Sequence, residues 1–234
     1  VLFRLLTFGH FEIIIGKENG QSEEKYMGKV DENKQQKEDA LFRSAYNLFM
    51  SNGISKTSIH DIVQDAGVAK GTFYLYFKDK FEIRDRLIAR TAEKLFKAAN
   101  TELKKVHVPK FEDKIIFIVD YVLEQMKKNK AVLRFVSKNL SWGIFRAAIE
   151  QKEEATGVKH LFDELLAECP GVQIEAPDTM LFLIIELASS ASYSTILDSD
   201  PVSYEELKPY LNASIRAIIK SHMYTTQRQE EQKI

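Results

Sequence analysis

The sequence predicts an all-α protein with a small N-terminal helical domain followed by a larger helical domain. Apolar residues recur at helical spacing through most of the 234 residues. No segment alternates apolar and polar residues for long enough to indicate a β-strand. Only ten glycines and five prolines interrupt the chain, and so few helix breakers favour long helices.

Residues 1–36 are expected to form an N-terminal extension that is disordered or partly non-native. Its first fifteen residues are apolar, but Arg4, His10 and Glu12 interrupt them, and the segment is too short to span a bilayer. Met27 begins a hydrophilic stretch typical of the lead-in to a first helix, so we interpret Met27 as the native translation start. The alternative is a genuine hydrophobic arm that packs on a partner subunit.

Residues 37–84 are expected to form the small domain, which contains three helices. The first helix ends at Gly53, and the second begins at Ser58, which has an acidic residue three positions later, as in a capping box. Gly67 then provides a left-handed turn, and a very short third helix covers residues 69–76. Two helices joined by so tight a turn predict a helix-turn-helix, whose second helix enters the major groove of DNA.

Helical patterns continue through residues 85–224, which we expect to form the larger domain, and residues 225–234 form a polar tail. Asp79 repeats the capping pattern and opens a long helix. The segment 178–197 is apolar on more than one face, which indicates burial against both the core and a partner subunit. Pro209 cannot donate a helical hydrogen bond, so the last helix is expected to kink or begin near it.

The segment TSIHDIVQDAGVAKGTFYLYFKDKFEI resembles the helix-turn-helix signature of TetR-family regulators, and the match extends over residues 41–87. This resemblance implies a homodimeric repressor, paired through its last two long helices, that binds near-palindromic operator DNA and is released by a small-molecule inducer. Ala69 departs from the serine often found at its position, which removes a side-chain N-cap. Carried over by position, the resemblance implies DNA contacts from Thr57, Ser58, Lys70, Gly71, Thr72, Tyr74, Tyr76 and Lys80.

The larger domain contains aromatic residues that belong to the core by default. The resemblance implies a ligand pocket among these helices, and such pockets are mostly apolar. The candidate ligand contacts are therefore aromatic, namely Phe117, Tyr121, Phe135, Trp142, Phe145, Phe182 and Tyr193.

No metal, cofactor, membrane partner or enzymatic activity is expected. The five histidines are scattered, and no phosphate-binding loop or nucleophile motif occurs. Cys169, the single cysteine, cannot form an internal disulfide, which fits a reducing cytoplasm. The net charge of −1 does not exclude a local DNA-binding face. Two alternatives stay open, a ligand-binding or scaffold protein with a non-functional DNA-binding half and an all-α enzyme. The choice between repression and activation is also open.

Overall fold

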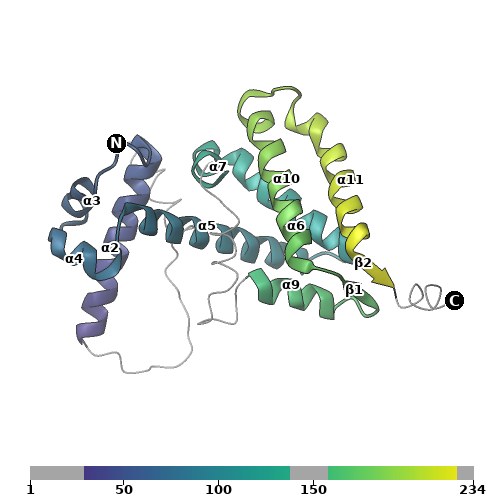
Figure 1. Ribbon diagram of the computed structural model, residues 1–234, viewed down its shortest axis with the longest axis horizontal. Helices are drawn as coiled ribbons and strands as arrows, with labels where there is room; N and C mark the ends of the chain where they lie inside the picture. The colour runs from purple at the N-terminus through teal and green to yellow at the C-terminus, as the bar shows by residue number, and fades with distance from the viewer. Residues whose placement is uncertain (1–28, 138–157, 226–234) are drawn as a thin grey trace. The chain divides into compact units, whose positions relative to one another are not determined.

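The computed structural model describes residues 29–137 and 158–225, and these ranges are almost entirely helical (Figure 1). The all-α prediction is therefore confirmed. The chain divides into two compact units, Val1–Thr91 and Ala92–Ile234. The division lies within the helix that Asp79 opens, whereas the sequence predicted a change of domain after residue 84. The proposed start at Met27, the alternative hydrophobic arm and the polar tail lie outside the described residues.

Unit 1 is built on a long first helix against which the shorter helices pack. It contains α2 (Lys29–Asn52), α3 (Ile59–Ala66), α4 (Lys70–Tyr76) and the first half of α5 (Lys80–Leu103). The helix α2 begins at Lys29, so residues 29–36 are helical rather than part of a disordered extension. It packs against α3, and α3 packs against α4 (Figure 1).

The start of α3, the turn after it and the start of α5 lie at the residues that the sequence indicated. The Ser58 hydroxyl accepts a hydrogen bond from the Asp61 backbone N–H at 3.1 Å, and the Asp61 carboxylate accepts one from the Ser58 N–H at 2.8 Å. Gly67 ends α3 with a φ of 67°, in the left-handed region that glycine adopts without steric cost. The Asp79 carboxylate accepts the Phe81 and Glu82 N–H groups at the start of α5. These three predictions are confirmed.

Aromatic packing fixes the position of α4. Phe73 and Phe77, one turn apart, are both buried. The Phe77 ring meets the ring of Phe42 on α2 edge to face, with centroids 5.1 Å apart, and lies 5.5 Å from that of Phe73. The short helix is therefore attached to α2 through one of its faces only.

Unit 2 is a bundle of helices with a small sheet. Its helices α6, α7, α10 and α11 pack together, and α9 packs on α6. Their bounds are Phe111–Lys128 for α6, Lys130–Ser137 for α7, Val158–Ala167 for α9, Pro177–Asp198 for α10 and Tyr204–His222 for α11.

Two strands in unit 2 were not predicted. The strands β1 (Val172–Ile174) and β2 (Met223–Thr225) pair antiparallel, with Gln173 opposite Tyr224. Strands of three residues are too short to show an alternating pattern in the sequence.

The last helix, α11, begins shortly before its proline. A capping box between Ser203 and Glu206 marks its start, and the helix continues through Pro209. Pro209 and Glu205, four residues earlier, are both exposed. Water can therefore bond the carbonyl of Glu205, which the missing proline N–H leaves without its helical donor.

Substitutions on the two faces of α4 should differ strongly in their effect on the free energy of unfolding. Phe73→Ala removes a fully buried ring and should lower the free energy of unfolding by about 3–5 kcal/mol. Leu75→Ala on the exposed face should change it by about 0.5 kcal/mol or less. Urea denaturation followed by circular dichroism measures both values. A loss from Leu75→Ala as large as that from Phe73→Ala would contradict the described position of α4.

Candidate functional site

The helix α4 presents an outward face that unit 1 does not use for packing. Lys70, Gly71, Tyr74 and Leu75 are exposed, and Thr72 is half-buried. Tyr74 retains 51% of its accessible surface and Leu75 79%. The turn at Gly67 and the burial of Phe73 on the other side of the helix give this face its direction. A short, rigidly seated helix with polar and aromatic groups on its free face can enter the major groove of DNA.

Two residues expected at phosphates are instead bonded within unit 1. The Thr57 side chain is 1% exposed, and its hydroxyl donates to the Gly53 carbonyl at 2.9 Å. The Lys80 ammonium donates to the carbonyls of Ile54 and Thr57, both at 2.9 Å, and more weakly to that of Ser55 at 3.4 Å. An ammonium has three donors, so these three acceptors use all of them. Both residues hold the connection between α2 and α3.

Tyr76 is also committed inside the unit. Its hydroxyl donates to the backbone carbonyl of Lys34 on α2 at 3.0 Å, and its ring is only half-buried. The residue therefore attaches the end of α4 to the exposed first half of α2. Tyr74 carries the exposed tyrosine hydroxyl of this helix.

The start of α3 carries a complete capping box. The Ser58 hydroxyl both accepts from the Asp61 N–H and donates to the Asp61 carboxylate at 2.7 Å. The hydrogen bonds from the Ser58 backbone and hydroxyl lower the pKa of Asp61. Asp61 therefore remains ionised at neutral pH, and the Ser58 side chain is already occupied by the cap.

The arginines of α5 face acidic or aromatic neighbours. Arg86 pairs with Glu82 at 2.6 Å, and Arg90 lies 4.0 Å from the centre of the Phe42 ring. In contrast, several lysines of unit 1 have exposed side chains, both near α3 and α4 and on the first half of α2: Lys56, Lys70, Lys78, Lys34 and Lys37. Exposed cations are therefore present around the short helices, although not there alone.

Leu75 also lies on the free face of α4, and its spacing in the sequence already indicated this position. Leu75 lies two residues from Phe73 and two from Phe77, which helical geometry places on the opposite side of α4. An apolar residue there cannot share the core of the two phenylalanines.

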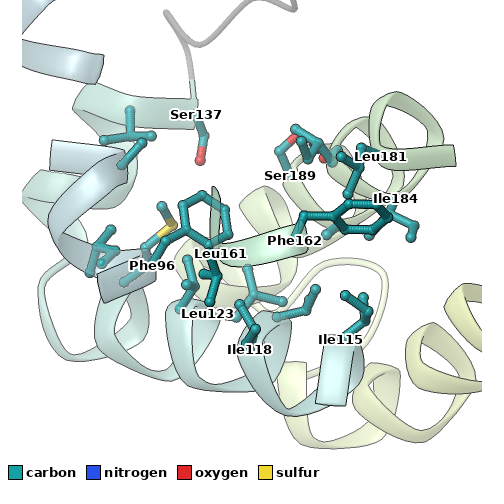
Figure 2. A pocket seen from close by; sticks show the side chains of 18 of the residues that line it. Phe96, Ile115, Ile118, Leu123, Ser137, Leu161, Phe162, Leu181, Ile184 and Ser189 are labelled. Atoms are coloured by element: carbon teal, nitrogen blue, oxygen red, sulfur yellow. Dashed lines mark hydrogen bonds between the residues drawn. The ribbon is translucent and has the colours of Figure 1, made fainter. Parts of the chain in front are cut away.

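Unit 2 contains an apolar cavity of about 110 Å³ among α6, α7, α9, α10 and the second half of α5 (Figure 2). Figure 2 shows Phe96, Leu123 and Phe162 among its labelled lining side chains. Among the described lining residues, hydroxyls belong to Ser137 and Ser189 alone, and Ser189 donates into its own helix at 2.7 Å. The part of the lining that the structure describes suits an apolar group and offers no ligand set for a metal ion.

Five of the seven aromatic residues expected at the ligand are described, and none of these five lines this cavity. Trp142 and Phe145 lie outside the described residues, and Phe117, Tyr121, Phe135, Phe182 and Tyr193 are absent from the lining. On α6 the lining comes from aliphatic residues at helical spacing: Ile115, Ile118, Val119, Val122, Leu123 and Met126. The predicted contacts were chosen for their aromatic character. The position of a side chain on the helix face, however, decides whether it reaches the cavity.

Comparison with known proteins supports the assignment of unit 1. Residues 41–87 match the family model described as bacterial regulatory proteins, tetR family. The HTH-type transcriptional regulator YvdT of Bacillus subtilis is 38% identical over 68 residues, which cover 29% of this chain and 33% of the relative. A Haemophilus influenzae HTH-type transcriptional regulator is 27% identical over 197 residues, 78% of this chain and 95% of the relative. The chain thus matches about a third of the first relative's length and almost all of the second's.

Solved structures share the fold over most of the chain. A tetR-family regulator from Shewanella sp. PV-4 has a TM-score of 0.56 and 16% identity, covering 80% of this chain and 98% of its own. FadR of Thermus thermophilus, a tetR-family repressor solved with lauroyl-CoA, has a TM-score of 0.53 and 18% identity, covering 77% and 92%. At these identities the likeness establishes the fold. Residues 41–87 are therefore similar to the helix-turn-helix of tetR-family regulators, and both relatives related in sequence are HTH-type transcriptional regulators.

Proposed function

We propose that the protein is a transcriptional repressor that binds near-palindromic operator DNA as a homodimer and leaves it when unit 2 binds an apolar small molecule. The single observation that carries the DNA-binding proposal is the free face of α4, which buried Phe73 and Phe77 hold on a tetR-family helix-turn-helix. The family is one of regulators, so we assign no catalytic role. The cytoplasm is the compartment where such a protein meets DNA.

The DNA contacts divide between direct and positioning residues. Lys70, Thr72 and Tyr74 supply donors on or beside the free face of α4, where they can bond phosphates or base edges. Gly71 leaves the helix bare at the same place. Thr57, Lys80 and Tyr76 act through the backbone that they hold, and the Ser58 side chain caps α3.

The affinity for operator DNA and its dependence on salt distinguish a lysine that contacts phosphate, Lys70, from one that positions the backbone, Lys80. Lys70→Ala should reduce the slope of log affinity against log salt by about one unit, because one phosphate contact is lost, and should leave the melting temperature unchanged. Lys80→Ala should weaken binding without changing the slope, and should lower the melting temperature by about 3–6 °C because three carbonyls lose their donor.

Fluorescence anisotropy with labelled operator duplex at several salt concentrations provides the measurement. A reduced slope with an unchanged melting temperature for Lys80→Ala would return Lys80 to the phosphate contacts. Gel-shift assays on DNA flanking the gene test the proposal as a whole. A scaffold with a non-functional DNA-binding half, or an all-α enzyme, should retain no discrete site there.

The proposed dimer pairs through α10 and α11. Within the described residues, α10 alone is long and apolar enough to cross a membrane by length and composition, which is weak evidence for a span. Only a third of its most apolar stretch is buried inside the chain, and Phe182 and Leu183 on it are 36% and 41% exposed. A partner subunit that covers this face accounts for its apolar character in a soluble regulator.

A charge on this face should weaken the dimer. Leu183→Glu places a carboxylate in the proposed interface and should shift the protein toward monomer at micromolar concentration, because burying an unpaired charge is costly. The matched control is Val106→Glu, an apolar position of unit 2 that is 49% exposed and lies outside α10 and α11. Sedimentation velocity measures both. Dimerisation of Leu183→Glu as tight as that of the control would contradict this interface.

The ligand proposal rests on the cavity. The described residues that line it include no charged side chain, so the bound group should be apolar, and a cavity of about 110 Å³ accepts one end of an alkyl chain or a small ring. FadR of Thermus thermophilus, which shares the fold, was solved with lauroyl-CoA. We therefore propose a ligand with an alkyl chain whose polar end stays outside the cavity.

Filling the cavity should abolish this binding. Val122→Phe enlarges a lining side chain of α6 and should weaken lauroyl-CoA binding at least tenfold, measured by calorimetry. Phe117→Leu, on the same helix but outside the lining, should leave the affinity unchanged. Because ligand and operator are linked, saturating operator should lower the affinity of the wild-type protein for lauroyl-CoA. Equal affinities for wild type and Val122→Phe would show that this cavity is not the ligand site.

A further inference from the structure

The outward face of α4 carries an apolar side chain, Leu75, that the described residues of unit 1 leave exposed. Leu75 is 79% exposed, the largest value among the exposed large apolar residues in residues 29–137 and 158–225. A single exposed leucine on a protein surface is ordinary and needs no explanation. Leu75, however, lies on the second helix of a helix-turn-helix, on the side away from buried Phe73 and Phe77.

Gly71 lies one turn before Leu75 on the same face of α4. A Cβ atom added to Gly71 would meet no atom within 4 Å, and its backbone is not left-handed. Neither packing nor backbone conformation within unit 1 therefore requires glycine here. A glycine inside a helix costs about 1 kcal/mol relative to alanine. The missing side chain at Gly71 would allow another molecule to approach the helix closely on this face.

The chemistry of Leu75 limits which chemical group of the approaching molecule it can contact. A leucine side chain has no hydrogen-bond donor or acceptor, so it gains free energy only by covering apolar surface. In the major groove of DNA the apolar group on a base edge is the C5-methyl of thymine, and the other groups are donors and acceptors. A leucine facing cytosine, adenine or guanine would leave those polar groups without partners.

We propose that Leu75 determines specificity by contacting the C5-methyl group of one thymine in each operator half-site, with Gly71 permitting the close approach. This inference rests on the proposed operator binding. It requires a T·A pair at one fixed position of each half-site. The contact is lost when the methyl group is removed, even though every hydrogen bond of the base pair is kept.

The test uses operator duplexes that the wild-type protein selects from a random DNA library. Each thymine of the half-site is replaced in turn by deoxyuridine, which lacks only the methyl group. One replacement in the half-site should lower the affinity of the wild-type protein about fourfold, the ratio that corresponds to about 0.8 kcal/mol for one buried methyl group. Replacing the same base pair by 5-methylcytosine and guanine should cost less than replacing it by cytosine and guanine.

Variants at Leu75 identify the side chain responsible. Leu75→Ala should bind the thymine operator more weakly than wild type and should not distinguish it from the deoxyuridine operator. Leu75→Met, which keeps an apolar side chain of similar length, should retain the distinction. Gly71→Ala should weaken binding to every duplex, because its Cβ would stand between the helix and the DNA. Circular dichroism should show all three variants folded, since both positions are exposed.

Two results would overturn the inference in different ways. If the wild-type protein selects an operator but no deoxyuridine replacement distinguishes wild type from Leu75→Ala, the methyl contact is refuted while operator binding stands. If the wild-type protein selects no sequence from the library, the proposed function fails and the methyl contact fails with it.

Discussion

The packing of two phenylalanines of the α4 segment against the core of unit 1 is the interaction on which the helix-turn-helix depends. Phe73 and Phe77 bury one side of a helix of only seven residues, and no side-chain cap supports its start at Ala69. So short a helix has little stability of its own. Packing against α2 therefore determines both that α4 exists and which of its residues face outward. The lysine, glycine, threonine, tyrosine and leucine of the motif acquire their roles from that orientation.

Much of this arrangement follows from local sequence signals. Ser58, Gly67 and Asp79 fix the ends of the helices through contacts within three residues, and such contacts can be predicted from spacing alone. The role of Lys80 could not be predicted in this way. Its ammonium bonds carbonyls more than twenty residues earlier in the chain, and only the folded connection between α2 and α3 brings them together. A lysine near a DNA-binding helix resembles a phosphate contact until its acceptors are known.

The residues that line the cavity also could not be predicted from local sequence signals. Helical patterns predicted the helices of unit 2, yet aromatic character misdirected the choice of lining residues toward Phe117 and Tyr121. Which stripe of a helix faces a cavity depends on how several helices cross, and that is a property of the assembled bundle. The pair β1 and β2 was missed for a related reason, because its pairing joins segments fifty residues apart through three residues each.

The helix α10 has two working faces. Leu181, Ile184, Ile185 and Ala188 line the cavity, while Phe182 and Leu183 on the same turns are exposed toward the proposed partner subunit. Any ligand that repacks the inner face acts on the helix that carries the outer one, so occupancy of the cavity and association of subunits share one free-energy balance. The amount of effector needed for a response would then depend on how much of the regulator the cell contains. The expression level of the regulator would thus help to set the effector concentration at which it responds.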